Sequence, residues 1–220
     1  MVWKFEMEEL SSHILFIGQG IFLTIKLLAG GLIIGIILGV FLSILRYNQI
    51  ATSLINRWVS ILRGTPLILQ LSIVYFTMPG LIGIKLNVIS AGILTFGLNS
   101  SAYIAEILRS GIESLPKGQF EAAKSLEISH YFMWKDIILP QVIRNIFPAL
   151  INEVIALLKE TALISTISGM DIMRMAQTLG AEKFTYFMPL CIAGAYYYTL
   201  VLLIEYLGKK IEKRGAYAKN

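Results

Sequence analysis

The feature that most constrains this chain is a long apolar run over residues 14–45, which reads ILFIGQGIFLTIKLLAGGLIIGIILGVFLSIL. As a helix rising ~1.5 Å per residue it exceeds the ~30 Å bilayer core, so it is expected to tilt or project. It is also far longer than the apolar core of a signal peptide. With 56% hydrophobic and 15% charged residues and a mean hydropathy of +0.70, the chain is predicted to be an integral membrane protein.

The spans are expected to be helices, because no ~10-residue alternation typical of membrane barrels is present. The fold class is therefore all-α, with five transmembrane helices. The first, third and fifth are expected at about residues 14–45, 88–109 and 186–207. The second opens near Arg57 and Arg63, restarts partway along at Pro66 and ends at about Met78, and the fourth starts between Pro140 and Pro148 and extends to about Ser165. Arg46, Arg57, Arg63 and the basic residues from Lys209 onward lie beside span ends. The positive-inside bias then predicts an outer N-terminus and a cytoplasmic C-terminus in the cell membrane. Without repeats or linkers, residues 1–220 are expected to form one transmembrane domain.

Three local patterns refine this picture. Gly31, Gly35 and Gly39 form a small-xxx-small ladder, which predicts close packing of the first span against another helix. Thr65 as N-cap and Pro66 at the first helical position predict a helix restart. A capping box from Ser168 to Asp171 predicts a short outer helix over residues 170–179.

A polar segment over residues 112–141 separates the third and fourth spans. Pro116 and Gly118 break the preceding helix. Apolar residues then recur every third position at Phe120, Ala123 and Leu126, with Lys117, Glu121 and Lys124 on the wet side. A second short helix, capped by Ser129, carries Tyr131, Phe132, Met133 and Trp134 in a row. This apolar surface predicts either a partner-docking site or a position in the lipid headgroup belt.

Several kinds of chemistry are excluded by the sequence. It contains no phosphate-binding loop, so any ATP that drives the protein is expected to bind another chain. There is no catalytic triad and no metal-ligand cluster, and His13 and His130 are interpreted as surface histidines. The net charge of +5 is explained by the positive-inside bias and not by nucleic acid. The single Cys191 can form no disulfide within the chain.

The most informative polar residue is Glu153 in the fourth span. Counted from Arg144 at the cytoplasmic margin, it lies nine residues in, which is roughly 13 Å deep and near the bilayer centre. A carboxylate there costs ~2.5 to 3.5 kcal/mol unless it has a cation, a wet cavity or a proton. Lys159 points to another face, whereas Glu160 shares the face of Glu153. The pattern predicts either a cationic substrate at Glu153 or a structural role, in which Glu153 pairs with a basic group elsewhere in the fold or is held protonated by hydrogen bonds.

The polar segment resembles the cytoplasmic EAA loop of bacterial ABC-importer permeases in its Glu121-Ala122-Ala123 triplet, Leu126 and the residues Ile138-Leu139-Pro140-Gln141. We call residues 112–141 the coupling loop. The polar-amino-acid branch of that family is also similar at Arg63-Gly64-Thr65-Pro66 with Gln70 and Tyr75-Phe76, at residues 99–106, at residues 109–112, and at Asn152, Lys159 and Thr161. One departure is Glu127, where the family has a glycine suited to positive φ; glutamate there would cost on the order of 1 kcal/mol.

The resemblance implies the permease subunit of a type I ABC importer for polar amino acids. Its coupling loop would contact an ABC ATPase through Glu121, Ala122, Ala123, Leu126, Tyr131, Phe132 and Trp134. Implied partners are a second permease subunit, as a homodimer or with a related chain, two ATPase subunits that hold ATP and magnesium, and an extracytoplasmic amino-acid-binding protein. The chain itself carries no cofactor and lies among membrane lipids.

The acidic face of the fourth span favours a basic amino acid such as arginine, lysine or histidine. Glu153 and Glu160 would attract its cationic group, and Asn152, Gln70, Tyr75, Asn99 and Ser101 could complete the substrate site or form interhelical hydrogen bonds. Two other readings stay open at this point: an efflux-type membrane domain with a wide apolar cavity, and a non-transporting membrane interaction protein.

Overall fold

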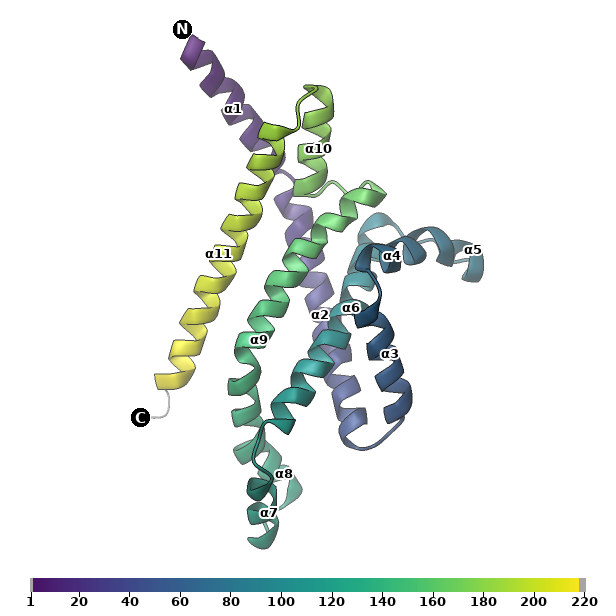
Figure 1. Cartoon of the computed structure of the whole chain (residues 1–220), viewed down its shortest axis with the longest axis vertical. Coiled ribbons are helices and arrows are strands. Elements are labelled where there is room, and N and C mark those ends of the chain that lie inside the picture. The colour runs from purple at the N-terminus through teal and green to yellow at the C-terminus, as the bar shows by residue number, and fades with distance from the viewer. Residues whose placement is uncertain (1, 218–220) are drawn as a thin grey trace.

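The structure, a computed structural model, describes residues 2–217, with side chains described for residues 9–81 and 83–213. Within that range all regular structure is helical, and the elements form an elongated bundle (Figure 1). They are α1 (Val2–Gly18), α2 (Ile21–Tyr47), α3 (Thr52–Gly64), α4 (Leu67–Ser72), η1 (Ile73–Thr77), α5 (Met78–Ile82), α6 (Val88–Glu113), α7 (Lys117–Ser125), α8 (His130–Phe132), η2 (Met133–Ile138), α9 (Leu139–Glu160), η3 (Thr161–Ile167), α10 (Ile172–Glu182) and α11 (Phe187–Tyr217). The predicted all-α class is confirmed.

Four of the five predicted spans are recognisable by length and apolar composition. Three are the helical segments Glu9–Tyr47, Val88–Glu113 and Phe187–Lys213. The fourth is the pair Thr52–Gly64 and Leu67–Leu81, which is bent by 102°. The fifth helix, α9, carries Arg144, Glu153, Lys159 and Glu160 and runs alongside α6 and α11 within the bundle (Figure 1). It therefore takes the place predicted for the fourth span along the chain.

The first span differs from the prediction, since it is divided between α1 and α2 at Gln19 and Gly20. A Cβ on Gly20 would lie 2.6 Å from the carbonyl oxygen of Asp171, so only glycine allows this approach. The break thus brings the first span against the start of α10. The backbone N–H of Ile172 then donates to Thr24 Oγ1 at 3.4 Å.

The predicted close packing of the glycine ladder is confirmed, because α2 lies directly against α6. A Cβ on Gly31 would come within 3.1 Å of the Phe96 Cβ, and one on Gly39 within 2.8 Å of Ile104. Gly35 faces Ser100 in the same way, at 2.9 Å. The glycine backbone of α2 therefore lies directly against side chains of α6, with no room for a methyl group between the two helices.

The helix restart near Pro66 occurs as predicted, but its capping differs. Thr65 is extended, with φ −117° and ψ 145°, and it ends α3, while Pro66 occupies the N-cap position of α4. The Thr65 hydroxyl donates back to the Ile61 carbonyl at 2.8 Å, so it caps nothing in α4. The physical reason is that proline disfavours the helical conformation in the residue before it.

The outer helix α10 also starts differently from the prediction. Its N-cap is Asp171, whose Oδ1 accepts from the Arg174 N–H at 2.9 Å. Ser168, predicted as the cap, has φ 65° and instead ends η3. Two boundaries also shift, because α9 stops at Glu160 before the 3-10 turn η3, and α11 continues to Tyr217. The α10 helix and the start of α1 lie at one end of the bundle, and α7 and α8 at the other (Figure 1).

Candidate transport and coupling sites

The coupling loop forms a small folded unit at the end of the bundle. Ala123 is buried with the partly buried Phe120 in a cluster that includes Leu115, Met133, Ile138 and Val142. The side-chain amides of Gln119 and Gln141 exchange hydrogen bonds at 3.1 and 2.8 Å, which ties α7 to the start of α9. Lys117, Glu121 and Lys124 are exposed, as predicted. The unit is thus joined firmly to two membrane helices and presents its polar face outward.

The backbone of the turn after α7 explains why the family has glycine at the position that Glu127 occupies here. Glu127 has φ 53°, in the left-handed region. Its N–H donates to the Lys124 carbonyl at 3.1 Å, and the Ile128 N–H donates to the Ala123 carbonyl at 3.0 Å. This pair of bonds defines a Schellman C-cap, in which the residue at the position of Glu127 must be left-handed. Glu127 therefore adopts the positive φ that suits the family's glycine, and the turn forms despite the Cβ.

The residues predicted to dock a partner divide into two groups. Leu126, Tyr131 and Phe132 are 73%, 65% and 53% exposed, and Glu121 and Ala122 are exposed beside them. Ala123 and Trp134 instead point inward. The prediction that Leu126 shares the covered face of Ala123 is wrong, because Leu126 ends the helix in the C-cap and turns away from the cluster.

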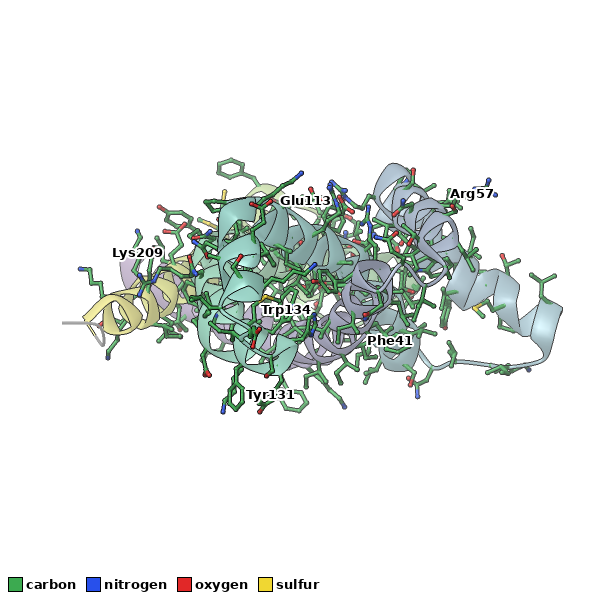
Figure 2. The ribbon with its side chains drawn as sticks, turned by 90° about the horizontal axis from the view of Figure 1, so that it is seen from below. Phe41, Arg57, Glu113, Tyr131, Trp134 and Lys209 are labelled. Atoms are coloured by element: carbon green, nitrogen blue, oxygen red, sulfur yellow. The ribbon has the colours of Figure 1, made fainter. Side chains whose placement is uncertain are left out.

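Trp134 connects the coupling loop to the first span. Its ring lies edge-on to Tyr47 at the end of α2, with centroids 4.8 Å apart, and its Nε1 donates to His130 Nε2 at 3.1 Å. Figure 2 shows Tyr131 projecting from the rim while Trp134 lies among the helices. This inward orientation could not be predicted, because four bulky residues follow one another and the π-helical η2 changes their spacing around the axis.

In the membrane-embedded part, Glu153 of α9 accepts a hydrogen bond from the Ser100 hydroxyl of α6 at 2.7 Å. In the part of the chain with described side chains, neither Glu153 nor Glu160 forms an ion pair with lysine or arginine. The two carboxylates are close enough to repel each other electrostatically. Glu153 therefore has a hydrogen-bond donor on α6, Ser100, which the sequence did not single out.

Gln70 and Asn99 come together at the bend between α3 and α4. Gln70 Nε2 donates to the Leu62 carbonyl at 2.8 Å, and Asn99 Nδ2 donates to Gln70 Oε1 and to the same Leu62 carbonyl at 3.2 Å. The end of α3 leaves carbonyls without intrahelical partners, and these amides satisfy one of them. Both residues therefore form hydrogen bonds that hold the bent pair α3 and α4 against α6. This is the interhelical role, which the sequence left open beside a substrate contact.

The other predicted substrate residues lie apart from this pair. The Ser101 hydroxyl donates to the Leu98 carbonyl at 2.6 Å and is buried within α6. Tyr75 packs edge-on against Phe76 at 5.0 Å. Asn152 is exposed and lines a cavity of about 260 Å³ between α9 and α11 with Glu205 and Lys209. The structure thus places Asn152 on a different face of α9 from Glu153.

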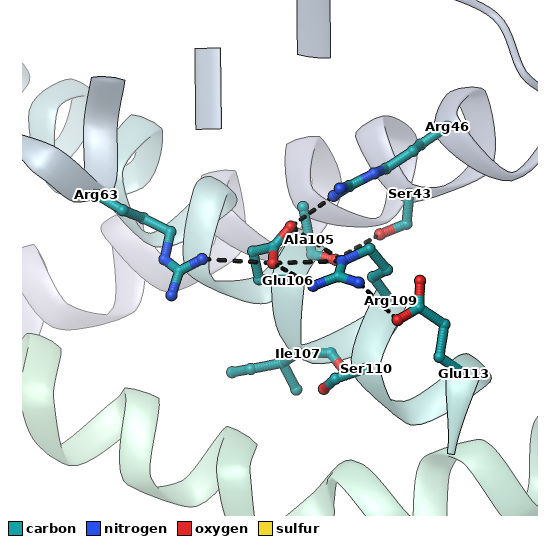
Figure 3. Close-up of polar contacts among 9 residues, drawn as sticks. All are labelled: Ser43, Arg46, Arg63, Ala105, Glu106, Ile107, Arg109, Ser110 and Glu113. Atoms are coloured by element: carbon teal, nitrogen blue, oxygen red, sulfur yellow. Dashed lines mark hydrogen bonds and ion pairs between the residues drawn. The ribbon is translucent and has the colours of Figure 1, made fainter. Parts of the chain in front are cut away.

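An ion cluster around Glu106 was only partly foreseen. Glu106 and Arg109 are three residues apart, a spacing that predicts a pair on one helix, and the pair forms at 2.9 Å. Glu106 also contacts Arg46 of α2 at 2.5 Å and Arg63 of α3 at 3.4 Å. Figure 3 shows the three guanidinium groups converging on this carboxylate. Sequence spacing could detect only the partner on the same helix, whereas the other two are brought in by tertiary packing.

Comparison with known proteins agrees with this architecture. The chain belongs to the family of binding-protein-dependent transport system inner membrane components, whose sequence profile matches residues 31–216. It is therefore a membrane-embedded permease subunit of an amino acid ABC importer, with no catalytic activity of its own. Membership implies ATPase subunits and a substrate-binding protein as partners. The efflux and interaction-protein readings are thereby set aside.

Individual relatives bear the names of amino acid transport systems. The chain is 48% identical over 203 residues to a protein of Rickettsia typhi named as the glutamine transport system permease GlnP, covering 91% of this chain and 93% of that one. It is 42% identical over 201 residues to the arginine transport system permease ArtQ of Bacillus subtilis, covering 90% and 92%.

Solved structures confirm the fold. A crystal structure of an amino acid ABC transporter with histidines is 33% identical and superposes with a TM-score of 0.85, covering 96% of this chain and 97% of that one. The permease of an inward-facing methionine ABC transporter, MetNI, is 18% identical with a TM-score of 0.71, covering 96% and 97%. The type I ABC importer permease fold expected from the coupling loop is therefore confirmed.

Proposed function

We propose that this permease subunit imports basic amino acids and that Glu153 contacts their cationic group. The observation that carries the proposal is a partly buried carboxylate deep in α9 whose hydrogen-bond donor is the neutral Ser100 hydroxyl. A hydroxyl leaves the negative charge uncompensated, and Glu160, about two helical turns further on along the same face, adds a second. A substrate ammonium or guanidinium between the helices would neutralise this charge. The arginine permease relative supports the same substrate class.

The remaining residues of the proposed site would act around this charge. Gln70 and Asn99 hold the bend after which α4 begins, and the unpaired N–H groups at the start of α4 would attract the substrate carboxylate. Tyr75, Ser101 and Asn152 remain candidates for further contacts. A substrate path would run between two copies of the chain, since five spans enclose little interior.

Transport would be driven from the coupling loop. In this proposal α7 and α8 insert into a groove of an ATPase subunit, which binds ATP and magnesium, with Leu126, Tyr131 and Phe132 as the exposed apolar contacts. Closure of the ATPases would pull the loops together and turn the spans from inward-facing to outward-facing. The coupling loop and C-terminus would lie in the cytoplasm, with α10 and the N-terminus outside, where a binding protein delivers substrate.

The substrate assignment is tested by uptake into proteoliposomes that contain the permease, its ATPase and its binding protein. Glu153→Gln keeps the side-chain shape and removes the charge, so arginine uptake should fall at least ~10-fold while the ATPase stays bound. Glu212→Gln, at the exposed end of α11, is the matched control and should leave uptake unchanged. Equal arginine uptake by the Glu153 variant would remove this residue from the site.

Competition between amino acids separates the two substrates that relatives suggest. Excess lysine and histidine should block arginine uptake through the wild-type complex, and glutamine should not. Because glutamine has no net side-chain charge, a glutamine transporter should tolerate Glu153→Gln. Blocking by glutamine alone would favour the substrate named for the Rickettsia relative over a basic amino acid.

The docking surface is tested by copurification. Phe132→Ala removes a half-exposed ring from the coupling loop and should reduce ATPase recovery with the permease several-fold. Phe187→Ala, which removes a ring that is 79% exposed at the other end of the bundle, should not. Full ATPase recovery with the Phe132 variant would assign that ring to the membrane headgroup belt instead.

A further inference from the structure

A polar cavity of about 420 Å³ lies where α2 turns into α3, and the transport proposal makes no use of it. Its polar lining comes from three elements: the end of α2, the start of α3 and the last turns of α6. The polar side chains other than Tyr47 are Ser43, Arg46, Gln49, Thr52, Asn56, Arg109 and the carboxylate of Glu113. All of them carry hydrogen-bonding groups, and the two arginines supply positive charge.

The charges around this cavity do not cancel. Arg46, Arg109 and Glu113 line the cavity, whereas Arg63 and Glu106 belong to the same ion cluster outside the lining. Three arginines against two glutamates leave the cluster one positive charge. Arg46 donates a single hydrogen bond, through Nη1 to Glu106, and a guanidinium has five N–H groups in all. The cavity therefore contains the partly desolvated guanidinium of Arg46, whose other N–H groups can donate hydrogen bonds to a ligand.

The start of α3 adds further donors to the same cavity. Thr52 Oγ1 is buried and has no hydrogen-bond partner among the residues with described side chains. The N-cap residue is Ala51, so no side chain caps the first N–H groups of this helix. A buried hydroxyl, the positive end of a helix and Arg46 thus face one space, a combination that recognises an oxyanion.

An apolar groove of about 500 Å³ adjoins this cavity, since Ser43, Tyr47 and Ile112 line both. Its other walls include Val40 and Ile44 of α2 and Leu139 and Val142 of α9. Ile44 is 54% exposed on the surface of the first span. A cationic polar cavity therefore opens onto an apolar groove at the end of a membrane helix.

We propose that this pair of cavities binds one anionic phospholipid. Its phosphate lies against Arg46 and the start of α3, and an acyl chain follows the groove past Ile44. Basic pockets between membrane helices recognise lipid phosphates in this way, and the groove adds apolar burial that a soluble anion cannot use. The site differs from the substrate site at Glu153, which lies deeper and is acidic.

The test measures lipid retained by the purified full-length permease in its transporter complex, by native mass spectrometry. Phosphatidylglycerol should be retained at least ~10-fold better than phosphatidylcholine with the same acyl chains, because the neutral headgroup gains less from Arg46. Equal retention of the two lipids would overturn the charge recognition. Displacement of phosphatidylglycerol by an equal concentration of inorganic phosphate would overturn the lipid as occupant.

Two variant pairs locate the site. Arg46→Gln should reduce phosphatidylglycerol retention on the order of tenfold, whereas Arg57→Gln, on the exposed face of the same turn region, should not. Ile44→Gln should reduce retention of the same lipid, whereas Phe41→Gln, 55% exposed but outside the groove, should not. The Ile44 side chain is apolar and belongs to no ion pair, so the Ile44 variant still tests the site if loss of the Arg46–Glu106 pair unfolds the protein. Equal effects within each pair would refute the proposal.

Discussion

Replacing Gly35 by alanine tests whether helix packing sets the position of the proposed substrate carboxylate. The added methyl would lie 2.9 Å from both Cβ and Oγ of Ser100, well inside the 3.4 Å at which ordinary contact begins. Overpacking of this kind costs about 1–3 kcal/mol. Alanine is favoured over glycine inside a helix by about 1 kcal/mol, which partly offsets the cost.

Gly194→Ala provides the matched control for this substitution. Gly194 lies inside α11, and a Cβ there would meet nothing within 4 Å. The control therefore gains the propensity term without the clash, so the two variants should differ by about 1–3 kcal/mol. For a protein of this size that corresponds to roughly 2–12 °C in Tm, with the Gly35 variant lower.

The assay is thermal unfolding of the purified permease in detergent, followed by arginine uptake in proteoliposomes. Because Ser100 donates to Glu153, its displacement should also reduce uptake by the Gly35 variant. A double variant, Gly35→Ala with Ser100→Gly, returns the methyl volume and should recover the Tm but not the uptake. Equal Tm values for the Gly35 and Gly194 variants would refute the packing argument.

Three further changes probe other parts of the fold. Glu106→Gln leaves three guanidinium groups without their shared carboxylate and should lower the free energy of unfolding by about 2 kcal/mol in a denaturant titration. Glu113→Gln changes a carboxylate that is 60% exposed and should cost under ~0.5 kcal/mol. Glu127→Gly relieves the left-handed strain at this position and should raise the Tm. The gain should be equivalent to only about 0.5 kcal/mol, because the flexibility of glycine in the unfolded chain offsets part of it. A lowered Tm would contradict the C-cap assignment. Burial raises the pKa of Asp171 above its ordinary 3.8, so the unfolded chain loses this proton at a lower pH than the folded chain does. The free energy of unfolding should therefore fall as pH rises from about 4. Asp171→Asn should remove that part of the pH slope in unfolding measured across pH 4 to 7, and an unchanged slope would exclude Asp171 as its source.

The fold was largely predictable because bilayer physics leaves few choices. Apolar runs of this length must become helices, since lipid offers no partner for free N–H and carbonyl groups. The glycine ladder likewise predicted a close helix contact, and Gly31, Gly35 and Gly39 do meet α6. The break at Gly20 was missed because both flanking segments are apolar and helical. Its cause lies more than a hundred residues away, at the backbone of Asp171.

The coupling loop was recognisable from its motif, but the direction of each side chain was not. Leu126 follows the apolar period of α7, yet it falls in the C-cap and is exposed. Trp134 belongs to a row of bulky residues, yet it packs on Tyr47. A period indicates a face only while the helix is regular, so caps and the π-helical η2 defeat the extrapolation.

The candidate site shows the same limit for polar residues. Spacing along one helix identified the Glu106–Arg109 pair and the shared face of Glu153 and Glu160. It could not find Arg46 or Arg63 for Glu106, nor Ser100 for Glu153, because those contacts join helices whose relative rotation is set by packing. Asn152, adjacent to Glu153 in sequence, lies on another face because successive helical residues are about 100° apart.

The sequence by itself determined that this chain crosses a membrane as helices, that a polar loop interrupts them, and that one carboxylate lies deep in a span. Those properties follow from local chemistry, namely transfer energies, helical period and turn residues. Only the tertiary structure decided which charges meet, which coupling residues face outward and where cavities form. These depend on how helices distant in sequence pack together, and a methyl-sized gap or clash at a glycine is enough to change that packing.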